Sequence, residues 1–326
     1  MYFTGKIQLE WHRGHNSSLH METGFFITKK FENNSAEFNT KNIQGEVYEM
    51  KKKLSLLLVL MLVLSSLFVA CANDKEASKA EENTEVDSNS LEGIKKKGKI
   101  IMGTSADYPP FETHMMIDGK DQIVGFDIEI AKYIADQLGV ELEIRDMDFD
   151  KLLGGLSTGM LDIVIAGMNP DPERAKEVNF TDIYFKSHHS VIIHKDDAAN
   201  ITKIEDLNGK SIGVQIGTTQ EEIAKTTIEN ADVLSLTTNP EIIMNLKTRK
   251  IDCAIMEDTV AKSFAKANDD LMVVEGIVIE NAAEGTAIAV KKGNDQLTQK
   301  LNEILADAKS KGLIDKWFVE ANELCN

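Results

Sequence analysis

The spacing of apolar residues changes repeatedly along the last two thirds of the chain, and each change predicts a new strand or helix. Residues 99–105 favour a strand, and residues 141–147 alternate as strands do. Apolar side chains recur at helical spacing from Phe126 to Leu138, where Gly139 can end a helix. The continuous apolar run 161–167 is typical of a strand buried on both faces of a sheet.

Strands and helices keep alternating beyond this region, which indicates an α/β fold. Asp150 can cap a short helix that runs through Leu156, and residues 107–111 have the composition of a turn. Further strands are expected at 190–194, 211–216, 251–256 and 286–290, and further helices near 219–229, after 239–240, near 257–267 and over 297–305.

One stretch of this pattern occurs twice, 90 residues apart. Each copy predicts a helix, a short turn and a buried strand that opens with an aspartate. The matching positions are Leu153, Leu156, Leu161, Asp162 and Ile165 in the first copy and Ile243, Leu246, Ile251, Asp252 and Ile255 in the second. The repeat predicts two similarly built lobes. Because ligands gather at the carboxyl ends of strands in such sheets, we expect Arg174 to face Glu257 across one site.

The most apolar stretch of the chain resembles a secretory signal that ends in a lipoprotein box. Three lysines follow Met50 and lead into 17 mostly apolar residues, 54–70, which Cys71 follows. This order predicts a signal peptide over 50–70 and lipidation of Cys71, which would anchor the protein to the outer face of the cell membrane, whether extracellular or periplasmic. A single membrane-spanning helix is the alternative, although 17 residues is at the short limit for one.

The segments on either side of this signal favour no packed structure. Residues 1–49 show no helical or strand period, and we interpret them as an N-terminal extension from a mis-assigned start, with Met50 as the initiator. A cytoplasmic module is the alternative. Residues 71–90 carry a single large apolar side chain beyond the cysteine, Val86, and are expected to form a flexible tether.

The charge balance excludes some classes of partner. Removing the 8 basic and 6 acidic residues of the first 70 from totals of 36 and 53 leaves 28 and 47, a net charge of −19. Nucleic acids and anionic membrane surfaces bind basic clusters, so we expect neither as a partner.

No metal or cofactor is expected. The three cysteines, Cys71, Cys253 and Cys325, show no disulfide or metal-ligand spacing, and Cys253 lies in an apolar run that favours a buried, inert thiol. The histidines at 188, 189 and 194 could hold zinc only with further ligands that the sequence does not place.

A series of motifs covers roughly residues 94–320 in uninterrupted order. They are Gly-Thr-Ser-Ala-Asp-Tyr-Pro-Pro-Phe-Glu at 103–112, Gly-Phe-Asp-Ile-Glu-Ile-Ala at 125–131, Asp-Phe-Asp-Lys-Leu-Leu at 148–153, Asp-Ile-Val-Ile-Ala-Gly-Met at 162–168, Phe-Thr-Asp-Ile-Tyr-Phe at 180–185, Gly-Val-Gln-Ile-Gly-Thr-Thr-Gln-Glu at 213–221 and Asp-Lys-Trp-Phe at 315–318. In these motifs the chain resembles the amino-acid-binding solute receptors of ABC importers, the polar amino acid uptake family.

The resemblance implies a two-lobed, periplasmic-binding-protein-like fold of type II, in which each lobe is an α/β sandwich and two crossover hinge strands join them. It places lobe 1 at 91–187 and 286–326 and lobe 2 at 188–285. It also implies a monomer that captures a free L-amino acid between its lobes. The protein would deliver the ligand to an ABC permease that a separate ATPase drives.

The resemblance also implies which residues of lobe 1 hold the ligand's carboxylate. Arg174 matches the arginine that grips it, since a guanidinium can donate two parallel hydrogen bonds. Gly167 and Asn169 would contribute backbone groups. Relatives usually carry serine or threonine at position 169, so the role of the asparagine side chain does not carry over.

Lobe 2 contributes three residues by the same resemblance. Thr218 and Thr219 open a helix whose unpaired amides suit an anion, and Thr219 matches a contact to the ligand carboxylate. Capping of that helix is an alternative role for these threonines. Glu257 matches an acid that pairs with the ligand ammonium.

Tyr108 and Phe149 match aromatic residues that sandwich the ligand's side chain. Four polar residues near the expected pocket bear on specificity: Ser105, Asp107, Glu112 and Gln220. They favour a polar or cationic amino acid, although Ser105 stands where some binders of cationic amino acids have an acid.

Fold does not fix function, so two other classes remain possible. A dehydratase on this fold would need a poised acid in the cleft, a role that Glu257 could take. A sensory module would report ligand binding to a second chain. We expect a binding protein without catalytic residues.

Overall fold

The computed structural model describes residues 87–280 and 283–325, which belong to one compact unit of the chain. The expectations for the N-terminal extension, the signal peptide, Cys71 and most of the tether fall on residues 1–86 and lie outside the described residues. Within the described ranges, no helix is long and apolar enough to cross a membrane.

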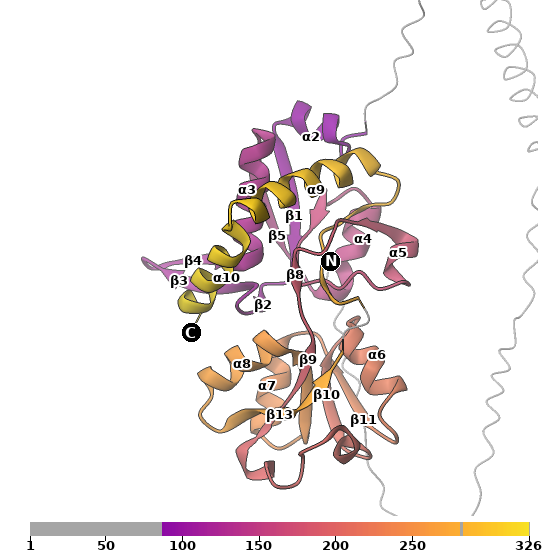
Figure 1. The fold of residues 1–326 in the computed structure, drawn as a ribbon, viewed down its shortest axis with the longest axis vertical. Coiled ribbons are helices and arrows are strands. Elements are labelled where there is room, and N and C mark those ends of the chain that lie inside the picture. Colours follow the sequence, from indigo (N-terminus) through magenta and orange to yellow (C-terminus); the bar gives the residue numbers. More distant parts are fainter. Residues whose placement is uncertain (1–86, 281–282, 326) are drawn as a thin grey trace, which may run out of the picture. The chain divides into compact units, whose positions relative to one another are not determined.

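The described residues form two lobes, each built on a five-stranded sheet (Figure 1). The sheet of lobe 1 has the strand order β5-β1-β6-β15-β7, and that of lobe 2 has the order β11-β10-β12-β9-β13. In both sheets the first three strands run parallel, and the fourth runs antiparallel to both of its neighbours. The prediction of two similarly built lobes is confirmed.

Lobe 1 contains the first and the last elements of the described chain. Its central sheet consists of β1 (Lys99–Thr104), β5 (Glu141–Asp146), β6 (Ile163–Val164), β7 (Val178–Phe180) and β15 (Ala289–Lys291). A second sheet consists of β2 (Asp107–Tyr108), β3 (Glu112–Ile117) and β4 (Lys120–Val124). Its helices are α2 (Leu91–Lys97), α3 (Phe126–Leu138), η2 (Phe149–Lys151), α4 (Leu152–Ser157), α5 (Arg174–Glu177), α9 (Asp295–Ser310) and α10 (Leu313–Leu324).

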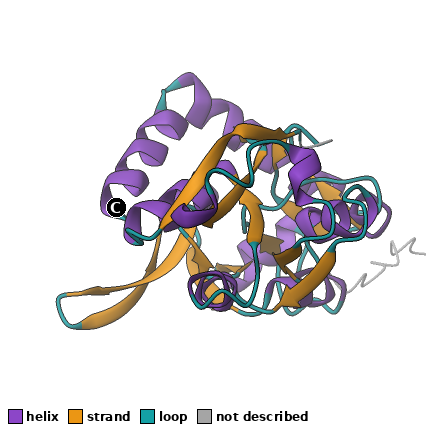
Figure 2. Cartoon of the chain, turned by 90° about the horizontal axis from the view of Figure 1, so that it is seen from below, coloured by secondary structure: helices purple, strands orange, loops and turns teal. Residues whose placement is uncertain are grey.

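Lobe 2 is a continuous segment between two crossovers. Its strands are β9 (His189–His194), β10 (Ser211–Gln215), β11 (Asp232–Leu236), β12 (Cys253–Glu257) and β13 (Leu271–Ile279). Its helices are η3 (Lys195–Asp197), η4 (Ile204–Leu207), α6 (Thr219–Thr226), α7 (Asn239–Lys247) and α8 (Asp258–Ala267). The crossovers carry β8 (Phe185–Lys186) and β14 (Gly285–Thr286), which pair antiparallel to each other. In both lobes helices lie beside the strands (Figure 1), and Figure 2 shows helices and strands together from below.

Most predicted elements are present, with four differences. The first two residues of the turn expected at 107–111 form the strand β2, which pairs with β3. The helix expected to begin at Asp150 starts as the 3-10 turn η2, so its first α-helical residue is Leu152. The apolar run 161–167 contains only two strand residues, Ile163 and Val164, although the N–H of Ile165 still donates to the carbonyl of Gly103 on β1. The apolar run at 286–290 divides between β14 and β15.

The sequence repeat corresponds to the same packing in both lobes. A side chain at Gly103 of β1 would lie 2.3 Å from Leu161 Cδ1, and one at Gly213 of β10 would lie 2.5 Å from Ile251 Cδ1. The two glycines let the apolar residue before β6 and before β12 pack directly against the neighbouring strand, β1 or β10. Each lobe therefore packs its repeated strand against its neighbour in the same way.

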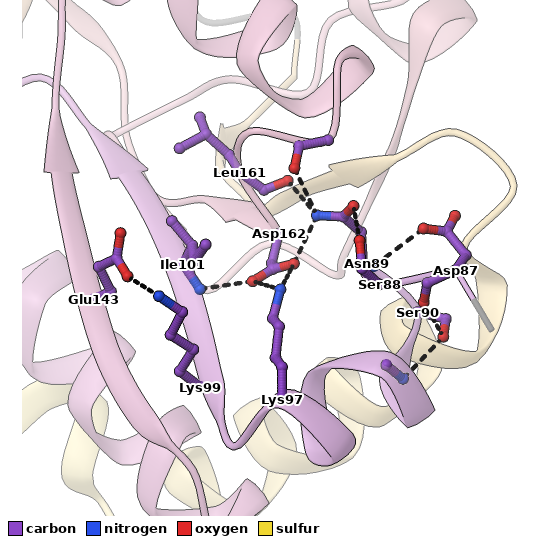
Figure 3. A network of polar contacts seen from close by, with 12 residues as sticks. Asp87, Ser88, Asn89, Ser90, Lys97, Lys99, Ile101, Glu143, Leu161 and Asp162 are labelled. Carbon is purple, nitrogen blue, oxygen red and sulfur yellow. Dashed lines mark hydrogen bonds and ion pairs between the residues drawn. The ribbon is translucent and has the colours of Figure 1, made fainter. Parts of the chain in front are cut away.

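The aspartate that opens each repeated strand binds the neighbouring strand in the same way. Asp162 accepts a hydrogen bond from the backbone N–H of Ile101 at 2.7 Å, and Asp252 accepts one from the N–H of Ser211 at 2.8 Å. Asp162 is fully buried and also binds Lys97 and Asn89 (Figure 3), whereas Asp252 is exposed.

Candidate functional site

A cavity lies between the lobes at the carboxyl ends of their strands. It is lined by Ser105, Asp107, Tyr108, Glu112, Phe149, Ala166, Gly167, Asn169 and Arg174 of lobe 1 and by Gln215, Thr218 and Gln220 of lobe 2. Six of the eight residues predicted to bind the ligand are therefore in its lining. Thr219 and Glu257 are not.

Arg174 is partly buried at the start of α5, and contacts from both lobes hold its guanidinium. Nε forms an ion pair with Asp171 at 3.0 Å, Nη1 donates to the carbonyl of Asn169 and Nη2 donates to the carbonyl of Gly217, both at 2.8 Å. The described residues thus engage three of the five N–H groups of a guanidinium and leave one on each Nη for a ligand. Burial lowers the pKa of Arg174, but an arginine remains charged.

Aromatic rings enclose the cavity on the lobe 1 side. The guanidinium carbon of Arg174 lies 5.3 Å from the ring centre of Phe149, which is a cation–π contact. Tyr108 stacks against the buried Phe111 with ring centres 5.7 Å apart. The Tyr108 ring also lies 2.9 Å from where a side chain at Gly167 would begin, so only glycine fits there.

The loop after β6 uses most of its polar groups to fix its own position. The N–H of Gly167 donates to Asp127 at 2.7 Å, which leaves its carbonyl as the group it can offer to a ligand. The carboxamide of Asn169 donates to the carbonyl of Gly285 and accepts from the Thr219 hydroxyl at 2.9 Å. The side chain of Asn169 therefore joins the two lobes at the second crossover.

The two threonines that open α6 have separate tasks. Thr218 caps the helix, because its hydroxyl accepts from the N–H of Glu221 and donates to the carbonyl of Gln215. Thr219 lies behind the cavity, where its hydroxyl contacts Asn169 and His189. Thr218 therefore has the alternative role, helix capping, and Thr219 contacts the cavity lining through Asn169.

Glu257 is buried, but its carboxylate serves its own helix. One oxygen accepts from the N–H of Val260 at 3.0 Å and the other from the hydroxyl of Thr259 at 3.1 Å, which caps α8. Burial raises the pKa of Glu257 to about 7. The acids in the lining are instead Asp107 and Glu112, which belong to the same lobe as Arg174.

Glu112 is the least satisfied polar group of the cavity. It is fully buried, and neither carboxylate oxygen accepts a hydrogen bond from the described residues. Burial, the neighbouring carboxylate of Asp127 and a side-chain hydrogen bond to it, which only protonated Glu112 can donate, raise the pKa of Glu112 well above its usual value. Asp127 is held by the N–H of Gly167 and the hydroxyl of Tyr184, so it supplies no positive charge to Glu112.

His189 is a buried residue of the site that the sequence did not identify as one. Burial lowers its pKa to about 4, so the imidazole is neutral at neutral pH. Nδ1 of His189 accepts a hydrogen bond from Nε2 of Gln220 at 3.2 Å, and Nε2 of His189 lies 3.3 Å from the hydroxyl of Thr219. The histidine therefore orients one residue in the lining and one behind it.

The other histidines expected near the crossover do not join His189. His188 lies 3.7 Å from Asp258, and His194 contacts Arg249 at 2.8 Å. Across the described ranges, no group of three or more histidine, cysteine or acidic side chains is arranged to hold a metal ion.

Two further residues that the sequence did not identify, Gln215 and Asn239, take part in the site from lobe 2. The repeat contained a signal for Asn239, which stands 90 residues after Phe149. Gln215 stands two residues after Gly213 as Ser105 does after Gly103, but these pairs are 110 residues apart and fall outside the repeat.

Comparisons with known proteins agree with this arrangement. Residues 100–320 match the model of the bacterial extracellular solute-binding proteins, family 3. The arginine-binding extracellular protein ArtP of Bacillus subtilis is 42% identical over 68% of this chain and 87% of its own length. The L-cystine-binding protein TcyJ of Escherichia coli is 29% identical over 71% of this chain and 87% of its own length.

A solved structure supports the same assignment. The amino acid ABC transporter substrate-binding protein AbpA of Streptococcus pneumoniae, bound to L-arginine, superposes with a TM-score of 0.70 at 36% identity, over 72% of this chain and 98% of its own. These relatives are named as binding proteins and not as enzymes. The chain therefore belongs to family 3 of the bacterial extracellular solute-binding proteins.

Proposed function

We propose that this protein captures a free L-amino acid with a cationic side chain between its lobes and delivers it to an ABC permease driven by a separate ATPase. The ligand carboxylate binds the two remaining N–H groups of Arg174. The cationic end of its side chain binds Glu112. The observation that carries the proposal is that Arg174 lines one cavity with Glu112, a buried acid whose oxygens accept no hydrogen bond from the described residues.

A buried carboxyl group without partners is costly unless a ligand satisfies it. A guanidinium or ammonium group would do so through charge-assisted hydrogen bonds. A neutral ligand would leave the group unsatisfied or keep it protonated. The arginine-binding relatives named above support a ligand of this class.

Isothermal titration calorimetry with L-arginine and L-citrulline tests the proposal, since citrulline has nearly the same shape without the charge. We expect arginine to bind at least about tenfold more tightly, because hydrogen bonds to charged groups contribute about 1.5–3 kcal/mol. Glu112→Gln should remove most of this preference. Glu320→Gln, on the exposed surface of α10, is the matched control.

The pH dependence gives a second readout of the same contact. Because the pKa of Glu112 is raised without a cation beside it, a cationic ligand must favour its ionised form and release a proton. The affinity for arginine should rise with pH in the native protein and be flatter in Glu112→Gln. Equal affinities for arginine and citrulline, or an unchanged preference in Glu112→Gln, would contradict the assignment of Glu112.

We further infer that Cys71 is the lipidated N-terminal residue of the mature protein. The attached lipid would anchor the protein, as a monomer, to the outer face of the cell membrane. The signal-like order of residues 50–71 supports this, as does membership of an extracellular solute-binding family. Mass spectrometry of the protein purified from membranes should find Cys71 at the N-terminus with attached acyl chains. An unmodified N-terminus upstream of Met50 would refute it.

A further inference from the structure

Asp107 lines the cavity on the lobe 1 side, yet its carboxylate accepts hydrogen bonds from residues of lobe 2. Oδ2 accepts the backbone N–H of Asn239 at 2.8 Å, and Oδ1 lies 3.2 Å from the side-chain amide of Asn239. Nε2 of Gln215 lies 3.4 Å from Oδ2. An acid in this position would otherwise be expected to bind a cationic ligand alongside Glu112.

The position of Asn239 explains why a carboxylate is suited to this contact. Asn239 is the first residue of α7, whose N-terminal N–H groups lack partners within the helix and carry the positive end of its dipole. Thr238 caps the helix by accepting from Glu241, so the N–H of Asn239 still needs an acceptor. Asp107 supplies that acceptor from the other lobe.

The groups that meet Asp107 are shielded from water and fixed in orientation. Asn239 is 2% exposed and Gln215 is 5% exposed. The amide of Asn239 also donates to Oε1 of Gln215 at 3.1 Å, and Nε2 of Gln215 donates to the carbonyl of Thr237 at 3.1 Å. Contacts within lobe 2 therefore hold both side chains in place, and their donors reach Asp107 where the lobes meet.

We propose that Asp107 is a positioning residue that stabilises lobe closure, and that it sets the affinity for every ligand without selecting among them. This inference rests on the proposed function, in which Glu112 reads the ligand's side chain. A ligand closes the lobes by binding the closed form better than the open one. Contacts between the lobes add to the stability of the closed form whichever ligand is present, so their loss weakens all ligands equally.

Calorimetry on Asp107→Ala separates this role from ligand contact. The affinities for arginine and for citrulline should both fall about tenfold or more, as expected for lost hydrogen bonds to a charged group, and their ratio should stay within about twofold of the native one. Glu112→Gln should change the ratio instead. Asp136→Ala, on the exposed surface of α3, removes a negative charge elsewhere and is the matched control.

If Asp107→Ala folds poorly, Asn239→Ala alone tests the inference, because it removes the side-chain donor of lobe 2 and should also lower both affinities without changing their ratio. Where both variants fold, the double variant should lose less affinity than the sum of the two single losses. Small-angle X-ray scattering without ligand should show a larger radius of gyration for Asp107→Ala than for Asp136→Ala. A changed arginine-to-citrulline ratio, additive losses or an unchanged radius of gyration would each overturn the proposal. A native protein that binds neither amino acid would refute the proposed function alone, since the scattering result does not depend on it.

Discussion

The two lobes share one backbone plan but supply different chemistry to the cavity. Strand order, the glycines at 103 and 213 and the aspartates at 162 and 252 all correspond. At the cavity, however, every charged residue of the lining comes from lobe 1, and lobe 2 lines it with the uncharged Gln215, Thr218 and Gln220. The two lobes therefore share the backbone positions from which side chains reach the cavity, but the side chains at those positions differ in charge.

This difference suggests a division of labour between the lobes. Lobe 1 holds Arg174 and Glu112, which can bind the two charged ends of a ligand before the lobes close. Lobe 2 offers carbonyl and amide groups that contact lobe 1, such as the carbonyl of Gly217 on Arg174. Under the proposed function, lobe 1 would recognise the charged groups of the ligand and lobe 2 would close over it.

The largest predicted difference between the lobes is in the stability lost when the equivalent aspartates, Asp162 and Asp252, are replaced. Asp162→Ala leaves the partly buried Lys97 ammonium and the N–H of Ile101 without their acceptor and should lower the free energy of unfolding by about 3 kcal/mol. Asp252→Ala removes one hydrogen bond at an exposed carboxylate and should cost less than about 1 kcal/mol. Urea unfolding of both variants measures these losses.

Asp162→Asn, which keeps the shape and removes the charge, separates the ion pair from cavity formation. It should lie between the native protein and Asp162→Ala. Equal losses for Asp162→Ala and Asp252→Ala would mean that burial does not distinguish the lobes. The comparison would then concern sequence alone.

The sequence was most informative where one local rule decides the structure. Helical spacing and Gly139 defined α3, and the repeat predicted the paired strands and their aspartates. The hairpin of β3 and β4 was not predicted, because its residues alternate weakly around an exposed Asp118-Gly119 turn. Helix α10 was represented only by the motif at 315–318, although its apolar face packs against α3 and α9.

The sequence predicted which residues line the cavity better than it predicted the hydrogen bonds that they make. Arg174, Phe149 and Tyr108 lie in the lining as expected. The direction of a carboxylate depends on which donor lies within reach, and the sequence does not show that Glu257 meets the N–H of Val260 or that Asp107 meets Asn239. Such choices arise from the packing of helix ends, which no local pattern encodes.

A smaller predicted effect, on ligand affinity, tests whether the charged groups that bind the ligand all belong to lobe 1. Arg174→Lys keeps a positive charge, but an ammonium cannot hold Asp171, Asn169 and Gly217 while gripping a carboxylate with two parallel bonds. The loss of two charge-assisted bonds should weaken amino-acid binding about 100-fold, or about 2.7 kcal/mol, in calorimetry. Glu257→Gln should change the affinity less than about threefold, since a glutamine oxygen can still accept from Val260 and preserve the cap of α8. If Glu257→Gln lost as much affinity as Arg174→Lys, lobe 2 would supply a charge to the ligand after all, and the cap would be a contact that Glu257 gives up when the ligand binds.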